Sequence, residues 1–223
     1  MIQGKMKSIL IGAINKAETE TFRRVSKGRL NGEENITAAL LALIESKCSD
    51  VLEKYNDVSD RFQYEVISKD FPKNTMEPVV GADFAISLRK FNIWRGIEKE
   101  VLIKSLLVQA KLPSNTDYGK LNEQIGFMES ITKESYVAVY DIDEDRVFVV
   151  KYIDVIAANY RASNVSKEKR FTLADFFSDI FVCKKAEVGF DANKLQNKED
   201  VLAYISGHEF EQQLEFVVKE IIE

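Results

Sequence analysis

Hydrophobic and polar positions change their spacing twice along this chain. Apolar residues recur at helical spacing over 6–27, and a second helical pattern starts at Glu33-Glu34 and fades near 55–60. The turn signal Asn31-Gly32 separates the two patterns. Acidic residues at the start of the second segment favour a helix, because they complement the positive end of its dipole. The sequence therefore predicts two N-terminal helices.

Period-two alternation replaces the helical spacing in the middle of the chain and predicts β-strands at 62–68, 79–88, 101–111, 136–140 and 146–152. An amphipathic pattern predicts a helix between the third and fourth strands, at 121–131. After the last strand the spacing is again helical, and helices are expected at 153–160, 172–184, 198–206 and 209–222.

This order of elements predicts an α/β (α+β) fold in which a mixed central β-sheet, entered by a three-strand meander, is flanked by helices. A length of 223 residues suits a single domain, with a core at about 30–150 and a helical C-terminal extension at about 153–223. The apolar residues of the last predicted helix are expected either to enter the core or to form a homodimer face: Phe210, Leu214, Phe216, Val217, Ile221 and Ile222.

The composition is that of an ordered globular protein, with 45% hydrophobic residues, 30% charged residues and only three prolines. The early apolar run Ile9–Ile14 is too short for a membrane span or a signal-peptide core, so we expect a cytoplasmic protein with no membrane partner. A single histidine, His208, argues against a metal site of cysteine and histidine. For Cys48 and Cys183 two buried reduced thiols are preferred over a disulfide.

A net charge of −5 argues against a protein that coats nucleic acid without specificity. It does not exclude a nuclease, because a bound metal ion inverts the field of a carboxylate-rich site. Basic residues gather in two places, which we expect to be either phosphate-binding surfaces or solvated faces. The first cluster contains Arg23, Arg24, Lys27 and Arg29, and the second contains Lys167, Lys169 and Arg170.

Two short polar motifs lie where the second predicted strand begins and the third ends: Gly81-Ala82-Asp83-Phe84 and Gln109-Ala110-Lys111. Strand side chains alternate, so Gln109 and Lys111 share a face. Residues 83 and 109 are equidistant from Gly96, so a hairpin turning there places Asp83 opposite Gln109. A slip of two residues would place Asp83 opposite Lys111 on the same face. A buried lysine beside a buried carboxylate is costly unless it is paired or functional.

These residues resemble the PD-(D/E)xK phosphodiesterase superfamily, also called restriction-endonuclease-like. The resemblance rests on Asp83, on Gln109-Ala110-Lys111 and on an acidic residue of the preceding helix, which Glu33-Glu34 supplies, and it spans about residues 30–150. Two positions depart from the family pattern. Ala82 stands in place of the usual proline, and Gln109 stands in place of the acidic residue of the motif.

The resemblance implies hydrolysis assisted by Mg²⁺ (or Mn²⁺). Asp83, the Gln109 amide oxygen, the Ala110 carbonyl and Glu34 would hold the metal, which as a hard cation prefers oxygen ligands. Glu33 is the alternative to Glu34, because helical spacing does not separate them.

Two further residues receive roles from the same resemblance. Lys111 would position and deprotonate the attacking water or stabilise charge on the phosphate. Gln124, on the helix that follows, would hydrogen-bond the lysine or a phosphate, or would simply be an exposed helix residue.

The implied function is an endonuclease acting on nucleic acid, with DNA favoured over RNA. The implied role is prokaryotic restriction or phage defence. The expected partner is a second copy of the chain, in a homodimer, or another protein of a defence system. Gln109 removes one negative charge from the metal site. The alternative is therefore a catalytically inactive nuclease-fold module for nucleic-acid binding or protein assembly.

Overall fold

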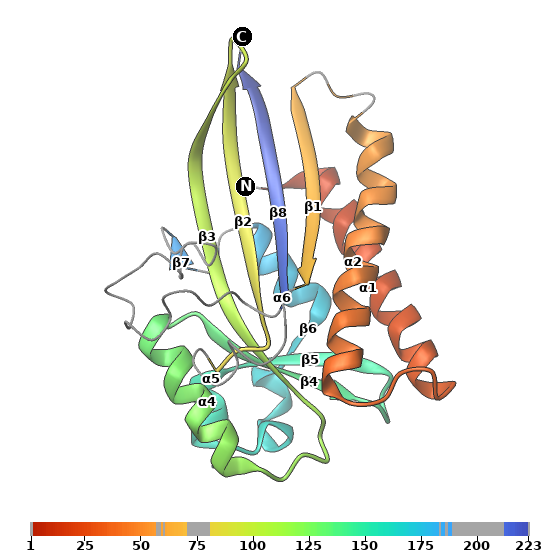
Figure 1. The fold of residues 1–223 in the computed structure, drawn as a ribbon, viewed down its shortest axis with the longest axis vertical. Coiled ribbons are helices and arrows are strands. Elements are labelled where there is room, and N and C mark those ends of the chain that lie inside the picture. The colour runs from red at the N-terminus through yellow and green to blue at the C-terminus, as the bar shows by residue number, and fades with distance from the viewer. Residues whose placement is uncertain are drawn as a thin grey trace.

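The computed structural model describes residues 2–56, 59, 61–70, 81–182, 184–185, 187–188 and 212–222 of the chain. The two N-terminal helices are confirmed as α1 (Gly4–Ser26) and α2 (Glu33–Asn56). They pack side by side along one edge of the molecule (Figure 1). Their buried residues recur every three or four positions, as in Leu10, Ile14 and Ala17 of α1, which is the stripe that the spacing predicted.

The expected mixed β-sheet flanked by helices is also confirmed. The strands lie in the order β1-β8-β2-β3-β4-β5-β6, and β7 pairs separately with β3. The β2–β3, β1–β8, β4–β5 and β5–β6 pairs are antiparallel, whereas β2–β8 and β3–β4 are parallel. The bounds are β1 (Phe62–Asp70), β2 (Phe84–Trp94), β3 (Ile97–Lys111), β4 (Ser135–Asp141), β5 (Arg146–Lys151), β6 (Phe171–Thr172), β7 (Glu187–Val188) and β8 (Gln212–Ile222).

The prediction of a helix over 209–222 is wrong, because Gln212–Ile222 forms strand β8. This strand lies between β1 and β2 and pairs with both, so the predicted three-strand meander and the wholly helical C-terminal third are wrong as well. Leu214, Phe216 and Val218 alternate into the core that the N-terminal helices cover. These side chains are buried as strand residues, so this segment does not form the apolar helix face that was expected for a homodimer. The predicted helix at 198–206, together with Cys183, His208 and Phe210, lies outside the described residues.

Three shorter helices complete the layers: α4 (Tyr118–Ile131), α5 (Tyr152–Ala157) and α6 (Leu173–Phe181). All three confirm predicted helices, with ends shifted by a few residues. Helix α4 connects β3 to the parallel strand β4, as a crossover between parallel strands requires. Residues of α1, α2 and α6 share one hydrophobic core with the sheet, and residues of α4 and α5 share a second. Ala110 belongs to the first core, so the flanking Gln109 and Lys111 face the side that α4 covers.

In the described part of the chain, no helix is both long and apolar enough to cross a membrane.

Gly81 has a structural reason to be glycine. Its φ is +75°, and a Cβ atom there would lie 2.1 Å from the carbonyl oxygen of Gln124 in α4. Replacing it with alanine is expected to lower the free energy of unfolding by more than about 1 kcal/mol, because both the backbone conformation and the space exclude a side chain. Gly126, in the same helix with open space around it, is the matched control. Gly126→Ala should raise stability by about 0.5–1 kcal/mol. Equal urea midpoints for the two variants would contradict this.

Cys48 is a free, buried cysteine of α2, as predicted. Burial raises the pKa of its thiol to about 12, so at pH 8 only about one thiol in ten thousand is a thiolate. In a Cys183→Ser background, Cys48 should therefore react with a disulfide reagent such as DTNB only as fast as the protein unfolds. Labelling should accelerate with urea in step with the unfolding curve, and rapid labelling of the folded protein would contradict the burial.

Candidate active site

The register of β2 on β3 places Asp83 opposite Gln109, as predicted. Phe84 pairs with Val108, and the Asp83 N–H donates to the Val108 carbonyl at 3.0 Å. The hairpin turns at Arg95-Gly96, where both residues have positive φ (50° and 78°), as a two-residue turn requires. That turn alone would place Asp83 opposite Val108. A bulge beside Lys90 and Phe91 adds one residue to β3 and so places Asp83 opposite Gln109.

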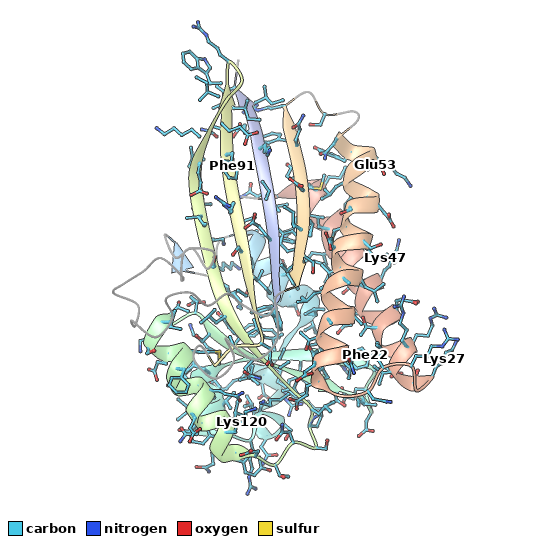
Figure 2. All side chains as sticks on the ribbon, in the orientation of Figure 1. Phe22, Lys27, Lys47, Glu53, Phe91 and Lys120 are labelled. Atoms are coloured by element: carbon cyan, nitrogen blue, oxygen red, sulfur yellow. The ribbon has the colours of Figure 1, made fainter. Side chains whose placement is uncertain are left out.

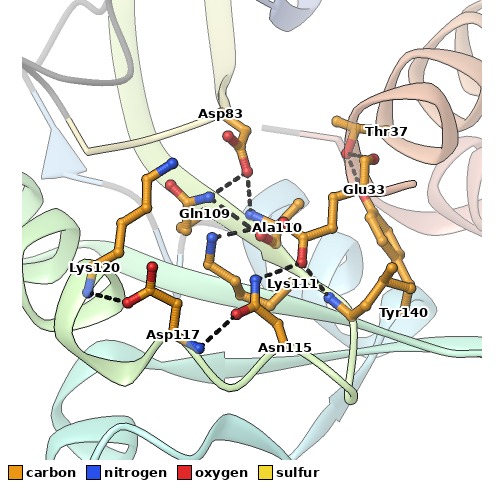
Figure 3. Close-up of polar contacts among 11 residues, drawn as sticks. Glu33, Thr37, Asp83, Gln109, Ala110, Lys111, Asn115, Asp117, Lys120 and Tyr140 are labelled. Atoms are coloured by element: carbon orange, nitrogen blue, oxygen red, sulfur yellow. Dashed lines mark hydrogen bonds and ion pairs between the residues drawn. The ribbon is translucent and has the colours of Figure 1, made fainter.

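Asp83 is held against the end of β3 by two hydrogen bonds (Figure 3). Its Oδ2 accepts from the Gln109 side-chain Nε2 at 2.5 Å and from the Ala110 backbone N–H at 2.6 Å. Gln109 is 1% exposed, so this contact is shielded from solvent. Hydrogen bonds to a carboxylate are stronger in such surroundings than in water. The carboxylate and the amide are therefore fixed at one point on the face that α4 covers.

Lys111 reaches the same end of the sheet and meets an acid from α2. Its Nζ lies 3.6 Å from Oε2 of Glu33, and the lysine is only 6% exposed. The other oxygen of Glu33 accepts from the Leu112 N–H at 2.9 Å and from the Asn115 amide at 3.0 Å. Glu33 thus connects the first turn of α2 with the loop that follows β3. This is the ionic partner that a buried lysine needs.

Glu33, the alternative to Glu34, is a helix acid that pairs with Lys111. Successive helix residues point about 100° apart, so the two glutamates leave the helix in different directions. Glu34 is exposed, whereas the carboxylate of Glu33 is mostly buried. The sequence contained both candidates but no information on how α2 is rotated against the sheet.

A buried tyrosine fixes the start of α2 relative to the sheet. The Thr37 hydroxyl donates to the Glu33 carbonyl at 2.8 Å, and its oxygen lies 2.6 Å from the Tyr140 hydroxyl of β4. Burial, together with the charges of Asp83 and Glu33, raises the pKa of Tyr140 far above its usual range. The phenol therefore remains protonated and can donate to Thr37 at any physiological pH.

Gln124 is brought to the site as a buried residue. It is 3% exposed and lies in α4 where the helix backbone passes over Gly81, two residues before Asp83. The alternative of an exposed helix glutamine is therefore wrong.

Two residues near the lysine escaped the sequence reasoning. Asn115 binds Glu33. The sequence feature that could have indicated Asn115 as a site residue is its position in the polar loop directly after the Lys111 motif. Arg161 lies with its guanidinium 5.1 Å from the centre of the Tyr118 ring. Both line a small pocket that also includes Lys111. No local pattern indicated Arg161, because it comes from the loop after α5, fifty residues beyond Lys111.

The basic clusters are partly neutralised within the structure. Arg23 and Arg24 both pair with Glu20 and lower the pKa of that carboxyl to about 2. Lys27 and Arg29 remain exposed in the α1–α2 turn. Figure 2 places Lys27 at the same end of the molecule as Lys120 of α4, which is the end that carries the site. The candidate phosphate-binding charge near the site therefore comes from exposed residues of two separate elements.

In the second cluster, Lys169 pairs with Asp154, and Arg170 donates to the backbone carbonyls of Ser163 and Val165. These bonds hold the loop together. Of this cluster, only Lys167 is exposed without an ion pair among the described residues.

The oxygen donors available to a metal ion are the Asp83 carboxylate, the Gln109 amide oxygen and the Ala110 carbonyl. Among the described residues, no three histidine, cysteine, aspartate or glutamate side chains are grouped so that they could hold a metal ion. The Gln109 Oε1 atom is buried and accepts no hydrogen bond within the described structure. A buried oxygen in that condition requires an explanation, and a hard cation would be a fitting ligand for it once the amide turned Oε1 toward Asp83. The donor set is thus compatible with Mg²⁺, but it is poor in charge.

Comparisons with protein-family models, with curated proteins and with solved structures found no match for this chain. Its function has to be inferred from the residues and their geometry.

The two glutamates of α2 are expected to differ in their effect on stability. Glu33→Gln removes the counter-charge of the buried Lys111 ammonium, and we expect it to lower the free energy of unfolding by about 1–3 kcal/mol. Glu34→Gln makes the same chemical change at an exposed position and should cost less than about 0.5 kcal/mol. Urea denaturation of both variants tests this. Equal losses, or a larger loss for Glu34→Gln, would remove Glu33 from the site.

Proposed function

We propose that this protein is a metal-dependent endonuclease that hydrolyses phosphodiester bonds in nucleic acid, with DNA favoured over RNA. The observation that carries the proposal is the convergence of Asp83, Gln109 and Lys111 at one end of the sheet, with Glu33 beside the lysine. A carboxylate, a side-chain amide and an ammonium group meet there within a mostly buried site. The resemblance of these residues to restriction-endonuclease-like enzymes supports the same activity and a role in restriction or phage defence.

Asp83, Gln109 and the Ala110 carbonyl would hold Mg²⁺ or Mn²⁺. When bound, the ion polarises the phosphodiester and makes a coordinated water more acidic. The protein prepares for this by fixing Asp83 with the Ala110 N–H at 2.6 Å, so that the carboxylate does not have to be ordered when the ion arrives. Asp83 immediately precedes β2 and Ala110 lies at the end of β3, two strands with a fixed register. Rigid elements of this kind hold ligands more accurately than loops do.

Lys111 would supply positive charge to the phosphate and orient the attacking water. Its ammonium group is mostly buried, so its field is screened less than that of a surface lysine. Glu33 acts as a positioning residue for it, because that carboxylate is itself fixed by Leu112 and Asn115. A preorganised cation of this type stabilises charge that develops on the phosphate oxygens in the transition state.

The substrate would approach from the end of the molecule that carries the exposed basic residues. Lys27 and Arg29 lie in the α1–α2 turn, Lys120 lies on α4, and Arg161 lines the pocket beside Lys111. Such side chains bind the sugar–phosphate backbone, which gives affinity without sequence specificity.

One observation favours the alternative of an inactive nuclease-fold module for binding or assembly. The Gln109 amide donates to Asp83, where the family pattern has a second acid, so a single carboxylate faces the proposed metal position. A module of this kind would bind nucleic acid without cutting it. Cleavage assays decide between the two proposals.

Lys111→Met is expected to reduce Mg²⁺- or Mn²⁺-dependent cleavage of duplex DNA by about 10²-fold or more, because it removes the charge next to the phosphate and keeps the aliphatic volume. Lys99→Met changes an exposed lysine of the β2–β3 hairpin and should cleave like the wild type. Cleavage is measured by gel electrophoresis, and circular dichroism checks folding.

If wild-type protein cuts neither DNA nor RNA with either metal, the enzyme proposal is overturned. Binding of duplex DNA in a gel-shift assay would then support the inactive module. Undiminished cleavage by Lys111→Met would remove the lysine from the mechanism.

A further inference from the structure

The side-chain amide of Gln109 is turned so that its nitrogen faces Asp83. Nε2 donates to Asp83 Oδ2 at 2.5 Å and lies 3.2 Å from the Ala110 carbonyl oxygen. Both neighbours are acceptors, so the nitrogen and not the oxygen must point toward them. The oxygen Oε1 is left buried with no hydrogen bond among the described residues. The amide therefore donates a hydrogen bond to the carboxylate, and in this orientation its own oxygen accepts none among the described residues.

This arrangement blocks the position where a cation would bind. A metal ion needs the oxygens of Asp83 and Gln109 on the same side, whereas an N–H group now occupies that side of the carboxylate. To present Oε1 together with Asp83, the amide has to turn by about half a rotation and give up its bond to the carboxylate. Cation binding therefore competes with a hydrogen bond that a glutamate at this position could not make.

The small number of charged oxygen ligands in the site also disfavours binding of a metal ion without substrate. Asp83 and Glu33 bring two negative charges, and the Lys111 ammonium pairs with one of them, that of Glu33. Glu33 is also occupied by the Leu112 N–H and the Asn115 amide. Protein sites set their affinity for hard divalent cations largely by the number of charged oxygen ligands. With Glu33 engaged in this way, Asp83 is the carboxylate that faces the proposed ion, and a single carboxylate makes a weak site for a metal ion alone.

We propose that Gln109 makes metal binding conditional on the substrate: the ion binds this site only together with a phosphodiester group, whose charged oxygen supplies the missing ligand. The proposal rests on the proposed nuclease function and adds a regulatory property to it. Without nucleic acid the Gln109–Asp83 hydrogen bond persists and the site does not hold the ion. With nucleic acid bound, the phosphate and the ion stabilise each other, and Oε1 turns toward the ion.

Thermodynamic linkage makes this testable, because a ligand that raises the affinity of another has its own affinity raised by the same factor. Mn²⁺ binding is measured by isothermal titration calorimetry and by the electron paramagnetic resonance signal of free Mn²⁺. The probe is a mixed-sequence duplex with phosphorothioate linkages, which keep their charge and slow hydrolysis. We expect the duplex to tighten Mn²⁺ binding to the wild type by about tenfold or more, within the usual range of coupling between sites.

Gln109→Glu removes the amide donor and adds the missing charge. Mn²⁺ should bind this variant without nucleic acid at least about tenfold more tightly than it binds the wild type, and the duplex should then add little. The matched control is Gln63→Glu, which adds the same negative charge at an exposed position of β1. Adding Asp83→Asn to Gln109→Glu should abolish the gain, which locates the ion.

Gln109→Met keeps the proposal testable if the glutamate variant does not fold. Methionine has neither the amide donor nor the oxygen ligand, so the duplex-dependent gain in Mn²⁺ affinity should disappear. Two results overturn the inference: wild-type protein that binds Mn²⁺ alone as tightly as Gln109→Glu does, or a duplex that leaves the Mn²⁺ affinity of the wild type unchanged. Either result obtained with a wild-type protein that cleaves DNA would leave the nuclease proposal intact. Failure of cleavage itself is a separate result, obtained without reference to Gln109.

Discussion

The pairing of β2 with β3 is the constraint on which the candidate site depends. Asp83 and Gln109 meet because Phe84 pairs with Val108, and a shift of one residue would turn the side chains of one strand to the opposite face. The bulge beside Lys90 sets this register, although it lies far from the site, near the other end of the hairpin. A local irregularity of the backbone therefore decides which side chains lie opposite each other at the site.

The second requirement is a fixed position of α2 against the end of β3. Glu33 binds Leu112 and Asn115 and pairs with Lys111, while Thr37 in the next turn meets Tyr140 of β4. These contacts combine a helix, a loop and two strands. The buried lysine is tolerated because the same network supplies its counter-charge. The polar residues that would serve catalysis thus also hold the two layers together, and changes in them are expected to affect stability and activity at once.

The proposed metal site would contain fewer carboxylates than an ordinary carboxylate metal centre. Gln109 stands where the resembled family has a charged ligand, and its amide can either donate to Asp83 or offer an oxygen. An amide with these two orientations has two states, and a ligand shifts the balance only by binding one of them better. Because a glutamate carries only oxygen acceptors, the proposed behaviour would follow from the residue that departs from the pattern of the resembled family.

The sequence by itself determined the helices α1, α2 and α4, most strands and the face shared by Gln109 and Lys111, because these follow from local periodicity. It did not determine the state of Gln212–Ile222, whose apolar residues fit both a helix and a strand. Only the tertiary structure decided this, because the space between β1 and β2 offers backbone partners on both sides of the segment. The choice of Glu33 over Glu34 and the presence of Asn115 and Arg161 near Lys111 also depended on packing. The rotation of a helix against a sheet and the path of a distant loop are set by contacts between segments that no local pattern records.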